Sequence, residues 1–319
     1  MSRCLVIINP SSGGGAARRY MMDLQLQLTS LFDHTEVKFT AGELDATRFA
    51  KAATENHYDA VFCMGGDGTV NETVNGIAQA GGDINFGFIP VGTVNDMSRA
   101  LEIPRSPLAA IHALSHSVIR HIDIGRCNDK YFCNNIAAGI IPKVVEEVTP
   151  KEKSILGPLA YFARGGQALL NNKSFNYRII TDDKDFVVKS PLVLALLTNC
   201  VSSFEKFMPT ATVDDGFMRI IIFKEYFILD ILRIFPLVIS GSIYNSRYVD
   251  IITVKKAHIQ LLNEVNDLPT NMDGDRGPDM PVELEVLPKF LRVYVPDQHH
   301  KYKKKASLLP NPANLLPKI

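Results

Sequence analysis

The stretch Met64-Gly65-Gly66-Asp67-Gly68-Thr69-Val70-Asn71-Glu72 joins a predicted strand to a predicted helix. An apolar run precedes it at 60–63, and apolar residues recur at helical spacing from 70 to 77. Glycines allow such a turn to approach a ligand closely, and the free N–H groups of the first helical turn attract an anion. The pattern therefore predicts a phosphate site. Because the Asp67 carboxylate would repel a phosphate, it also indicates a divalent cation between the two.

A second turn of the same kind follows one strand–helix unit later, at Gly92-Thr93-Val94-Asn95-Asp96, after a predicted strand at 86–91. Two neighbouring parallel strands that end in this way place Asp67 and Asp96 at the same edge of one sheet, where open α/β sheets bind ligands. A single glycine-rich turn commonly has no ligand. The prediction of a phosphate site therefore depends on the presence of both turns.

The two turns also carry a family resemblance. Gly65-Gly66-Asp67-Gly68-Thr69 and the run from Gly92 to Leu101 together resemble the diacylglycerol kinase catalytic domain family, which includes bacterial soluble lipid kinases and sphingosine kinases. The resemblance implies an ATP-dependent lipid kinase of phospholipid metabolism that converts diacylglycerol to phosphatidic acid. Two alternatives stay open: an NAD kinase-like enzyme, since NAD kinases share the first motif, and a nucleotide-binding regulator without turnover.

A third glycine-rich turn follows the first predicted strand, although it lacks the lysine of a P-loop. The resemblance implies that this turn belongs to the nucleotide site and that Thr40, after the second strand, contacts the nucleotide. By itself the Thr40 hydroxyl is typical of a cap or turn residue. The residues implied to bind ATP are Asn9, Pro10, Ser11, Ser12, Gly13, Thr40, Gly65, Gly66, Asp67, Gly68, Thr69, Asn71, Glu72, Gly92, Thr93 and Asn95.

Composition limits the class of protein. The chain has 319 residues, enough for two domains, and its 34 basic and 34 acidic residues balance, so we expect no nucleic-acid partner. Five cysteines without a C-x-x-C pair indicate buried, reduced thiols in a cytoplasmic protein. No apolar run reaches the ~20 residues that a transmembrane segment needs. A lipid substrate would therefore be met transiently at the membrane surface.

The pattern of elements predicts the fold class. Strands and helices alternate up to about residue 119, which predicts an α/β N-terminal domain with a parallel, doubly wound sheet. The short runs that follow predict an antiparallel β-sandwich or a barrel, of which we expect the sandwich. The resemblance implies the same architecture, like that of NAD kinases and diacylglycerol kinases. We expect a nucleotide-binding domain at 1–125, a lipid-substrate and metal domain at 126–298, and a basic, proline-containing tail at 299–319.

The second half of the chain is expected to contain helical insertions among its strands. We expect separate strands at 282–287 and 291–295, and helical insertions at 157–170 and 227–240. The second insertion has apolar residues at helical spacing, which suits either a core helix or an element that faces a membrane. Exposed strand edges in a sandwich also allow a homodimer.

The turn Thr212-Val213-Asp214-Asp215-Gly216-Phe217 has the composition of an ordinary acidic hairpin. The resemblance implies a Mg²⁺ site in it, connected through water to Asp67 and Asp96. The implied metal ligands are Thr212, Asp215 and the carbonyl of Phe217, with Asp214 as an alternative. A neutral hydroxyl at Thr212 departs from the family pattern and would weaken such a site.

The second-domain turn Asn271-Met272-Asp273-Gly274-Asp275 resembles an Asp-Gly-Glu motif whose glutamate is the family's proposed general base. The chain offers Asp275 there, one methylene shorter, so its carboxylate must lie closer to the substrate hydroxyl. Asp273 is the alternative base. The resemblance thus assigns catalysis to Asp275, Asp67 and Asp96, and we expect the carboxylates of Asp67, Asp96 and Asp215 to converge on one cation.

Overall fold

The computed structural model describes residues 1–139, 174–201, 204, 207–225, 230–262 and 268–297. The first domain is built on four parallel strands in the order β2-β1-β3-β4. These strands are β1 (Arg3–Ile8), β2 (His34–Phe39), β3 (Ala60–Gly65) and β4 (Asn85–Pro90). The three inner strands are almost entirely buried, as apolar strands covered on both faces must be, while β2 at the edge is half-exposed.

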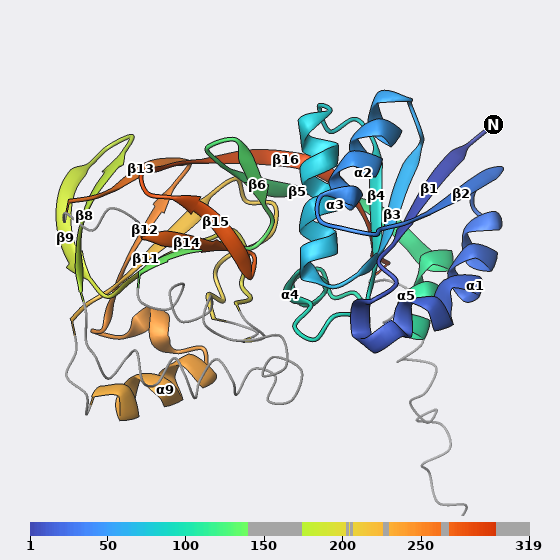
Figure 1. The fold of residues 1–319 in the computed structure, drawn as a ribbon. Coiled ribbons are helices and arrows are strands. Elements are labelled where there is room, and N and C mark those ends of the chain that lie inside the picture. Colours follow the sequence, from blue (N-terminus) through green and yellow to red (C-terminus); the bar gives the residue numbers. More distant parts are fainter. Residues whose placement is uncertain (140–173, 202–203, 205–206, 226–229, 263–267, 298–319) are drawn as a thin grey trace, which may run out of the picture.

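The helices of the first domain lie on both faces of this sheet (Figure 1). They are α1 (Ala16–Thr29), α2 (Asp45–Glu55), α3 (Asp67–Gln79), α4 (Asp96–Ala100) and α5 (Pro107–Ala113). The chain moves outward from β1 to β2 and then back past β1 to β3. With right-handed crossovers, this reversal places α1 on the opposite face from α2 and α3. The predicted doubly wound α/β domain is confirmed.

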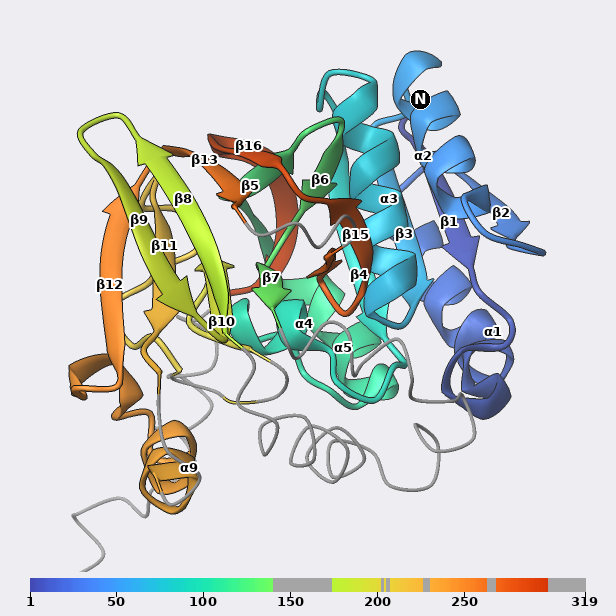
Figure 2. The same cartoon turned by 60° about the vertical axis from the view of Figure 1, so that its left-hand side comes forward.

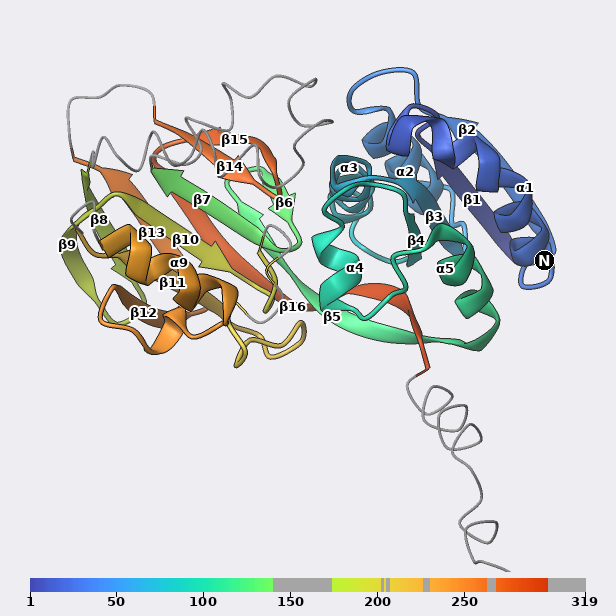
Figure 3. The same ribbon diagram turned by 90° about the horizontal axis from the view of Figure 1, so that it is seen from below.

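One long strand carries the sheet from the first domain into the second. Residues 282–296 form β16 (Val282–Pro296), whose end pairs in parallel with β4 and which runs antiparallel to β5 (Ser117–Cys127) along most of its length. We expected two separate strands here. The structure instead has one strand with an irregularity between Leu287 and Leu291, so both halves stay in one sheet. Figure 3 shows β5 and β16 side by side between the domains.

The second domain is the predicted antiparallel sandwich (Figure 2). Its first layer continues the shared sheet through β13 (Lys256–Leu261), β8 (Phe175–Thr181) and β9 (Asp185–Ser190), with β6 (Lys130–Phe132) beside β5. Its second layer has the order β12 (Val249–Val254), β11 (Met218–Phe223), β10 (Leu192–Leu196), β7 (Asn135–Gly139), β14 (Pro269–Met272) and β15 (Asp275–Asp279). Apolar side chains of both layers share one buried cluster, which explains their pairing. The domain limits stay predictions, because β5 and β16 belong to the sheet of both domains.

The structure tests some of the remaining expectations, and others concern residues that it does not describe. In the second insertion α9 (Ile231–Ile239) is helical, and Ile234, Leu237 and Val238 pack against buried residues of the second layer, which supports the core-helix interpretation. The predicted helix at 157–170 and the tail at 299–319 lie outside the described residues. All five cysteines are buried and free, as expected. Within the described part of the chain, no helix is both long and apolar enough to cross a membrane.

Close packing of α2 on α3 generates a prediction. A Cβ on Gly76 would lie 2.2 Å from the Thr47 carbonyl oxygen and 2.9 Å from the Ala50 Cβ. We expect Gly76→Ala to lower the free energy of unfolding by about 1–3 kcal/mol, because overpacking outweighs the gain in helix propensity. Urea denaturation measures the change. Gly42→Ala, whose Cβ would meet nothing within 4 Å, is the control, and equal effects of the two substitutions would contradict the prediction.

Candidate functional site

The glycine-rich turns that follow β1 and β3 meet where the strand order reverses. β1 and β3 flank this point, and open α/β sheets bind ligands outside the carboxyl ends of such strands. The Asn9 side-chain amide donates to Thr69 Oγ1 at 3.1 Å across the gap, and the Ser11 N–H and hydroxyl both donate to Asn9 Oδ1. Thr40 also lies at this edge, because its N–H donates to the Ile8 carbonyl. Asn9 and Thr69 therefore hold the two turns together.

The three glycine-rich turns pack against one another through their backbones. A Cβ on Gly92 would lie 2.7 Å from the Gly66 Cα, so Gly92 could not carry a side chain without a shift. Gly13 has φ 59°, and a Cβ there would lie 2.5 Å from the Val91 carbonyl oxygen. Glycine is required where backbones approach this closely. The structure thus brings the three predicted turns to one edge of the sheet.

The Asp67 carboxylate connects the glycine-rich turn after β3 to the one after β4. It accepts the Asn95 N–H at 2.8 Å and the Asp96 N–H at 3.0 Å. Burial raises the pKa of Asp67 to about 6, aided by the neighbouring charges of Asp96 and Asp273 and opposed by the two N–H donors. Asp96 is itself buried, and its carboxylate accepts a hydrogen bond from the Cys200 thiol of the second domain at 3.4 Å. The sequence contained no signal for this cysteine.

Asp275 of the second domain lies over the first turn of α3. Its Oδ2 is 3.0 Å from the position that a Cβ on Gly68 would occupy. Glu72, one turn further along α3, accepts the Ala46 N–H at 3.2 Å, and its pKa is raised by burial and by the Asp275 charge. The predicted base is therefore beside the predicted phosphate turn. Glycine at 68 is what allows the carboxylate to approach the backbone there.

Asp273 orients the turn that carries Asp275. Its buried carboxylate accepts four hydrogen bonds: the N–H groups of Cys133, Asn134 and Asn135, and the Asn71 side-chain amide at 2.8 Å. Burial raises the pKa of Asp273. A carboxylate already engaged by four donors is poorly placed to accept a substrate proton, so the geometry favours Asp275 over this alternative base.

Two asparagines of α3 connect the domains. The Asn75 side chain pairs with Tyr131 in both directions, accepting its N–H at 2.9 Å and donating to its carbonyl at 2.8 Å. The Asn71 amide donates to the same carbonyl at 3.2 Å and to Asp273. We expected Asn71 to contact the nucleotide, whereas its side chain contacts the second domain. Sequence reasoning did not include Asn75, although it lies four residues after Asn71 on the same helix face.

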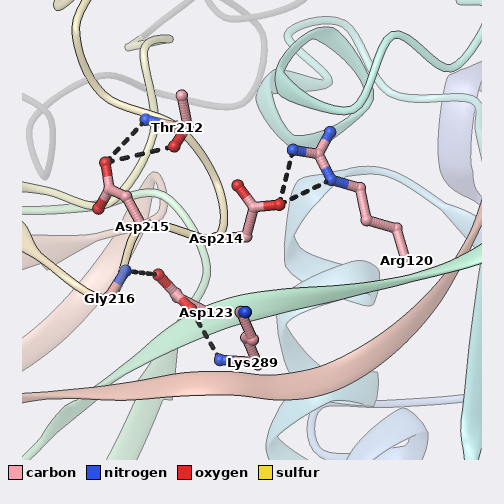
Figure 4. A network of polar contacts seen from close by, with 7 residues as sticks. All are labelled: Arg120, Asp123, Thr212, Asp214, Asp215, Gly216 and Lys289. Carbon is pink, nitrogen blue, oxygen red and sulfur yellow. Dashed lines mark hydrogen bonds and ion pairs between the residues drawn. The ribbon is translucent and has the colours of Figure 1, made fainter.

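The acidic turn of the second domain forms a separate network with β5 (Figure 4). Asp123 accepts the Gly216 N–H at 2.6 Å and the Lys289 N–H at 2.7 Å, and burial raises its pKa. The guanidinium of Arg120 donates to the Asp214 carboxylate at 2.9 Å and 3.2 Å. The turn is thus fixed to the sheet that both domains share.

The predicted Mg²⁺ ligands in this turn are occupied by an arginine. Asp215 Oδ1 accepts from Arg219 Nη1 at 2.8 Å, Asp215 Oδ2 lies 2.6 Å from Arg219 Nη2, and the Phe217 carbonyl accepts from Nη1 at 3.2 Å. The Thr212 N–H and hydroxyl also donate to Asp215 Oδ2. Burial raises the pKa of Asp215, but Arg219 and the backbone donors outweigh it and hold the pKa below its ordinary value. This donor set does not fit a divalent cation.

The expected convergence of three carboxylates is not found. Among the residues that the structure describes, no three His, Cys, Asp or Glu side chains are placed to hold a metal ion together. Asp67 and Asp96 belong to the glycine-rich turns, whereas Asp215 pairs with Arg219 in the network of Asp123. Asp67 accepts backbone N–H groups of the neighbouring turn, and the charge of Asp215 is balanced within its own loop by the Arg219 guanidinium.

Two family models match the chain. The model described as the diacylglycerol kinase catalytic domain matches residues 3–127, and the model described as the YegS C-terminal NAD kinase beta sandwich-like domain matches residues 134–295. Together the two models cover the glycine-rich turns and the second-domain turns described above.

Relatives match over nearly the whole length. A diacylglycerol kinase of Staphylococcus saprophyticus is 34% identical over 295 residues, covering 92% of this chain and 96% of that protein. One from Staphylococcus aureus is also 34% identical over 295 residues, covering 92% and 93%. A crystal structure of a diacylglycerol kinase from Bacillus anthracis is similar with a TM-score of 0.78 at 22% identity, covering 94% of this chain and 98% of that chain. The last likeness concerns the fold alone.

The environment of Asp67 predicts an unusual titration. Its pKa is raised from 3.8 to about 6, so the folded state holds the proton more tightly than the unfolded state does. The resulting stabilisation is complete below pH 3.8 and is lost as pH rises through about 6. Carbon-detected NMR of labelled aspartate carboxyl groups should show a resonance with a midpoint near pH 6 that disappears in Asp67→Asn. Asp185→Asn is the control, and a midpoint of Asp67 below pH 4.5 would contradict the prediction.

Proposed function

We propose that this chain, which belongs to the diacylglycerol kinase family, uses ATP as the phosphoryl donor and diacylglycerol as the acceptor. Membership of the family makes the chain a phosphotransferase with an alcohol acceptor. The product would be phosphatidic acid. The observation that carries this proposal is the placement of Asp275 against Gly68, which puts a second-domain carboxylate beside a phosphate turn of the first domain.

The donor side of the reaction would use the three glycine-rich turns. ATP, bound as its Mg²⁺ complex, would place its phosphates against the turns that begin at Asn9, Gly65 and Gly92. The close approach of these backbones requires glycine at 13 and 92, and backbone N–H groups of the turns would contact the phosphates. The N–H groups at the start of α3 would stabilise the negative charge on the transferred group. Asp67 would keep the second turn in place through Asn95 and Asp96.

The acceptor side would use Asp275. The lipid hydroxyl oxygen attacks the γ-phosphorus, the bond from that phosphorus to the bridging oxygen breaks, and ADP leaves. The hydroxyl proton passes to the Asp275 carboxylate, which must lie within hydrogen-bond reach. Asp273 and Asn71 would position the turn that carries Asp275, since they connect it to α3.

The lipid acceptor determines where the protein acts. We place the protein in the cytoplasm, with transient contact to a membrane surface where diacylglycerol is available. A homodimer through an exposed strand edge stays a prediction.

A substrate comparison tests the proposed activity. Protein, labelled ATP and Mg²⁺ are incubated either with diacylglycerol in detergent micelles or with NAD. We expect labelled phosphatidic acid and no NADP. Formation of NADP instead would favour the NAD kinase alternative, and ATP binding without any labelled product would favour a regulator. Label in a different lipid from a total extract would keep the kinase and replace the acceptor.

The general-base assignment predicts a large kinetic effect. Asp275→Asn should lower kcat for lipid phosphorylation by about 10²–10⁴-fold while ATP binding is retained, because only the proton acceptor is removed. Asp279→Asn, an exposed residue of the same strand β15, is the matched control and should stay within about twofold. Initial rates and nucleotide affinity measure the two effects. Equal kcat values for the two variants would exclude Asp275 as the base.

A further inference from the structure

Arg219 is a buried charge in an apolar strand. It is the second residue of β11, whose other members are apolar and buried, and its side chain is only 11% exposed. A buried guanidinium must be neutralised and hydrogen-bonded to be tolerated. Its partners are therefore part of the reason that this strand accepts an arginine.

Those partners are the groups that the family resemblance implies as metal ligands. Nη1 lies between Asp215 Oδ1 at 2.8 Å and the Phe217 carbonyl oxygen at 3.2 Å, and Nη2 lies 2.6 Å from Asp215 Oδ2. The planar guanidinium thus spans the carboxylate and the carbonyl at once. A divalent ion bridging the same oxygens would meet a fixed positive charge. Displacing that charge would leave an arginine buried without its partner.

The loop that Arg219 holds is anchored to the sheet shared by the domains. Asp123 of β5 donates its own N–H to the Val213 carbonyl at 2.7 Å and accepts the Gly216 N–H at 2.6 Å. The order of residues 212–217 therefore affects how the second layer of the second domain is attached to β5. A cation is needed here to balance Asp215 beside Asp123 and Asp214, whose charges act on one another.

We propose that Arg219 is the built-in cation of the 212–217 loop and takes the place of a divalent ion between Asp215 and Phe217. The loop is then ordered without metal, and the chain needs Mg²⁺ only as the partner of its nucleotide. The inference depends on contacts within the loop and not on which hydroxyl is phosphorylated. It goes beyond the proposed activity and is tested without measuring that activity.

The test is hydrogen exchange, followed by mass spectrometry, on the nucleotide-free full chain. Peptides covering residues 210–219 are compared in EDTA and in millimolar Mg²⁺. We expect the same slow exchange in both conditions, because Arg219 already holds the Thr212 and Phe217 amides through Asp215. Exchange of these peptides that slows when Mg²⁺ is added to the wild-type chain would overturn the proposal.

Variants of Arg219 provide a second, independent arm. In EDTA, Arg219→Gln should speed exchange of the same peptides by about tenfold, and Arg219→Lys should recover part of the protection because it restores the charge. Arg178→Gln removes an exposed two-bond arginine–aspartate pair elsewhere in the domain and should leave the loop unchanged. Unchanged exchange in Arg219→Gln would overturn the proposal. If that variant does not fold, the wild-type comparison still decides the question.

Discussion

The hydrogen bonds from Asn95 and Asp96 to the partly buried Asp67 carboxylate are the interaction on which the site depends. They connect the turns after β3 and β4 and bring Gly66 and Gly92 into backbone contact. A carboxylate in this position has a raised pKa because burial disfavours its charge, and two N–H donors compensate only partly. The backbone of these turns and the N-terminus of α3 suit recognition of an anion at this edge of the sheet.

The second domain completes this edge through a few specific contacts. Asn75 pairs with the backbone of Tyr131 as a neighbouring strand would, and Asn71 binds Asp273. Asp273 in turn fixes the backbone that places Asp275 near Gly68. The position of the proposed base is thus set by buried amide and carboxylate groups. Their loss would leave unsatisfied partners at the boundary between the domains.

The acids at the glycine-rich turns and those of the 212–217 loop have different kinds of partner. At the glycine-rich turns, Asp67 is held by N–H groups and Asp96 by a thiol of the second domain among its contacts. In the second-domain loop, guanidinium groups bind Asp214 and Asp215. The Arg219 guanidinium contacts the Asp215 carboxylate and the Phe217 carbonyl, which the family resemblance implies as metal ligands.

The sequence by itself determined the doubly wound sheet, the sandwich and the edge at which the glycine-rich turns meet, because each depends on patterns within short contiguous segments. Only the tertiary structure decided that β16 is one strand, that Asn71 meets Asp273 at a separation of 202 residues, and that Asp215 is bound by Arg219. Side-chain partners across such distances are selected by packing and desolvation, which no local pattern records. The expected cluster of three carboxylates is not found among the described residues, because the sequence shows which residues are acidic but not which partners they bind.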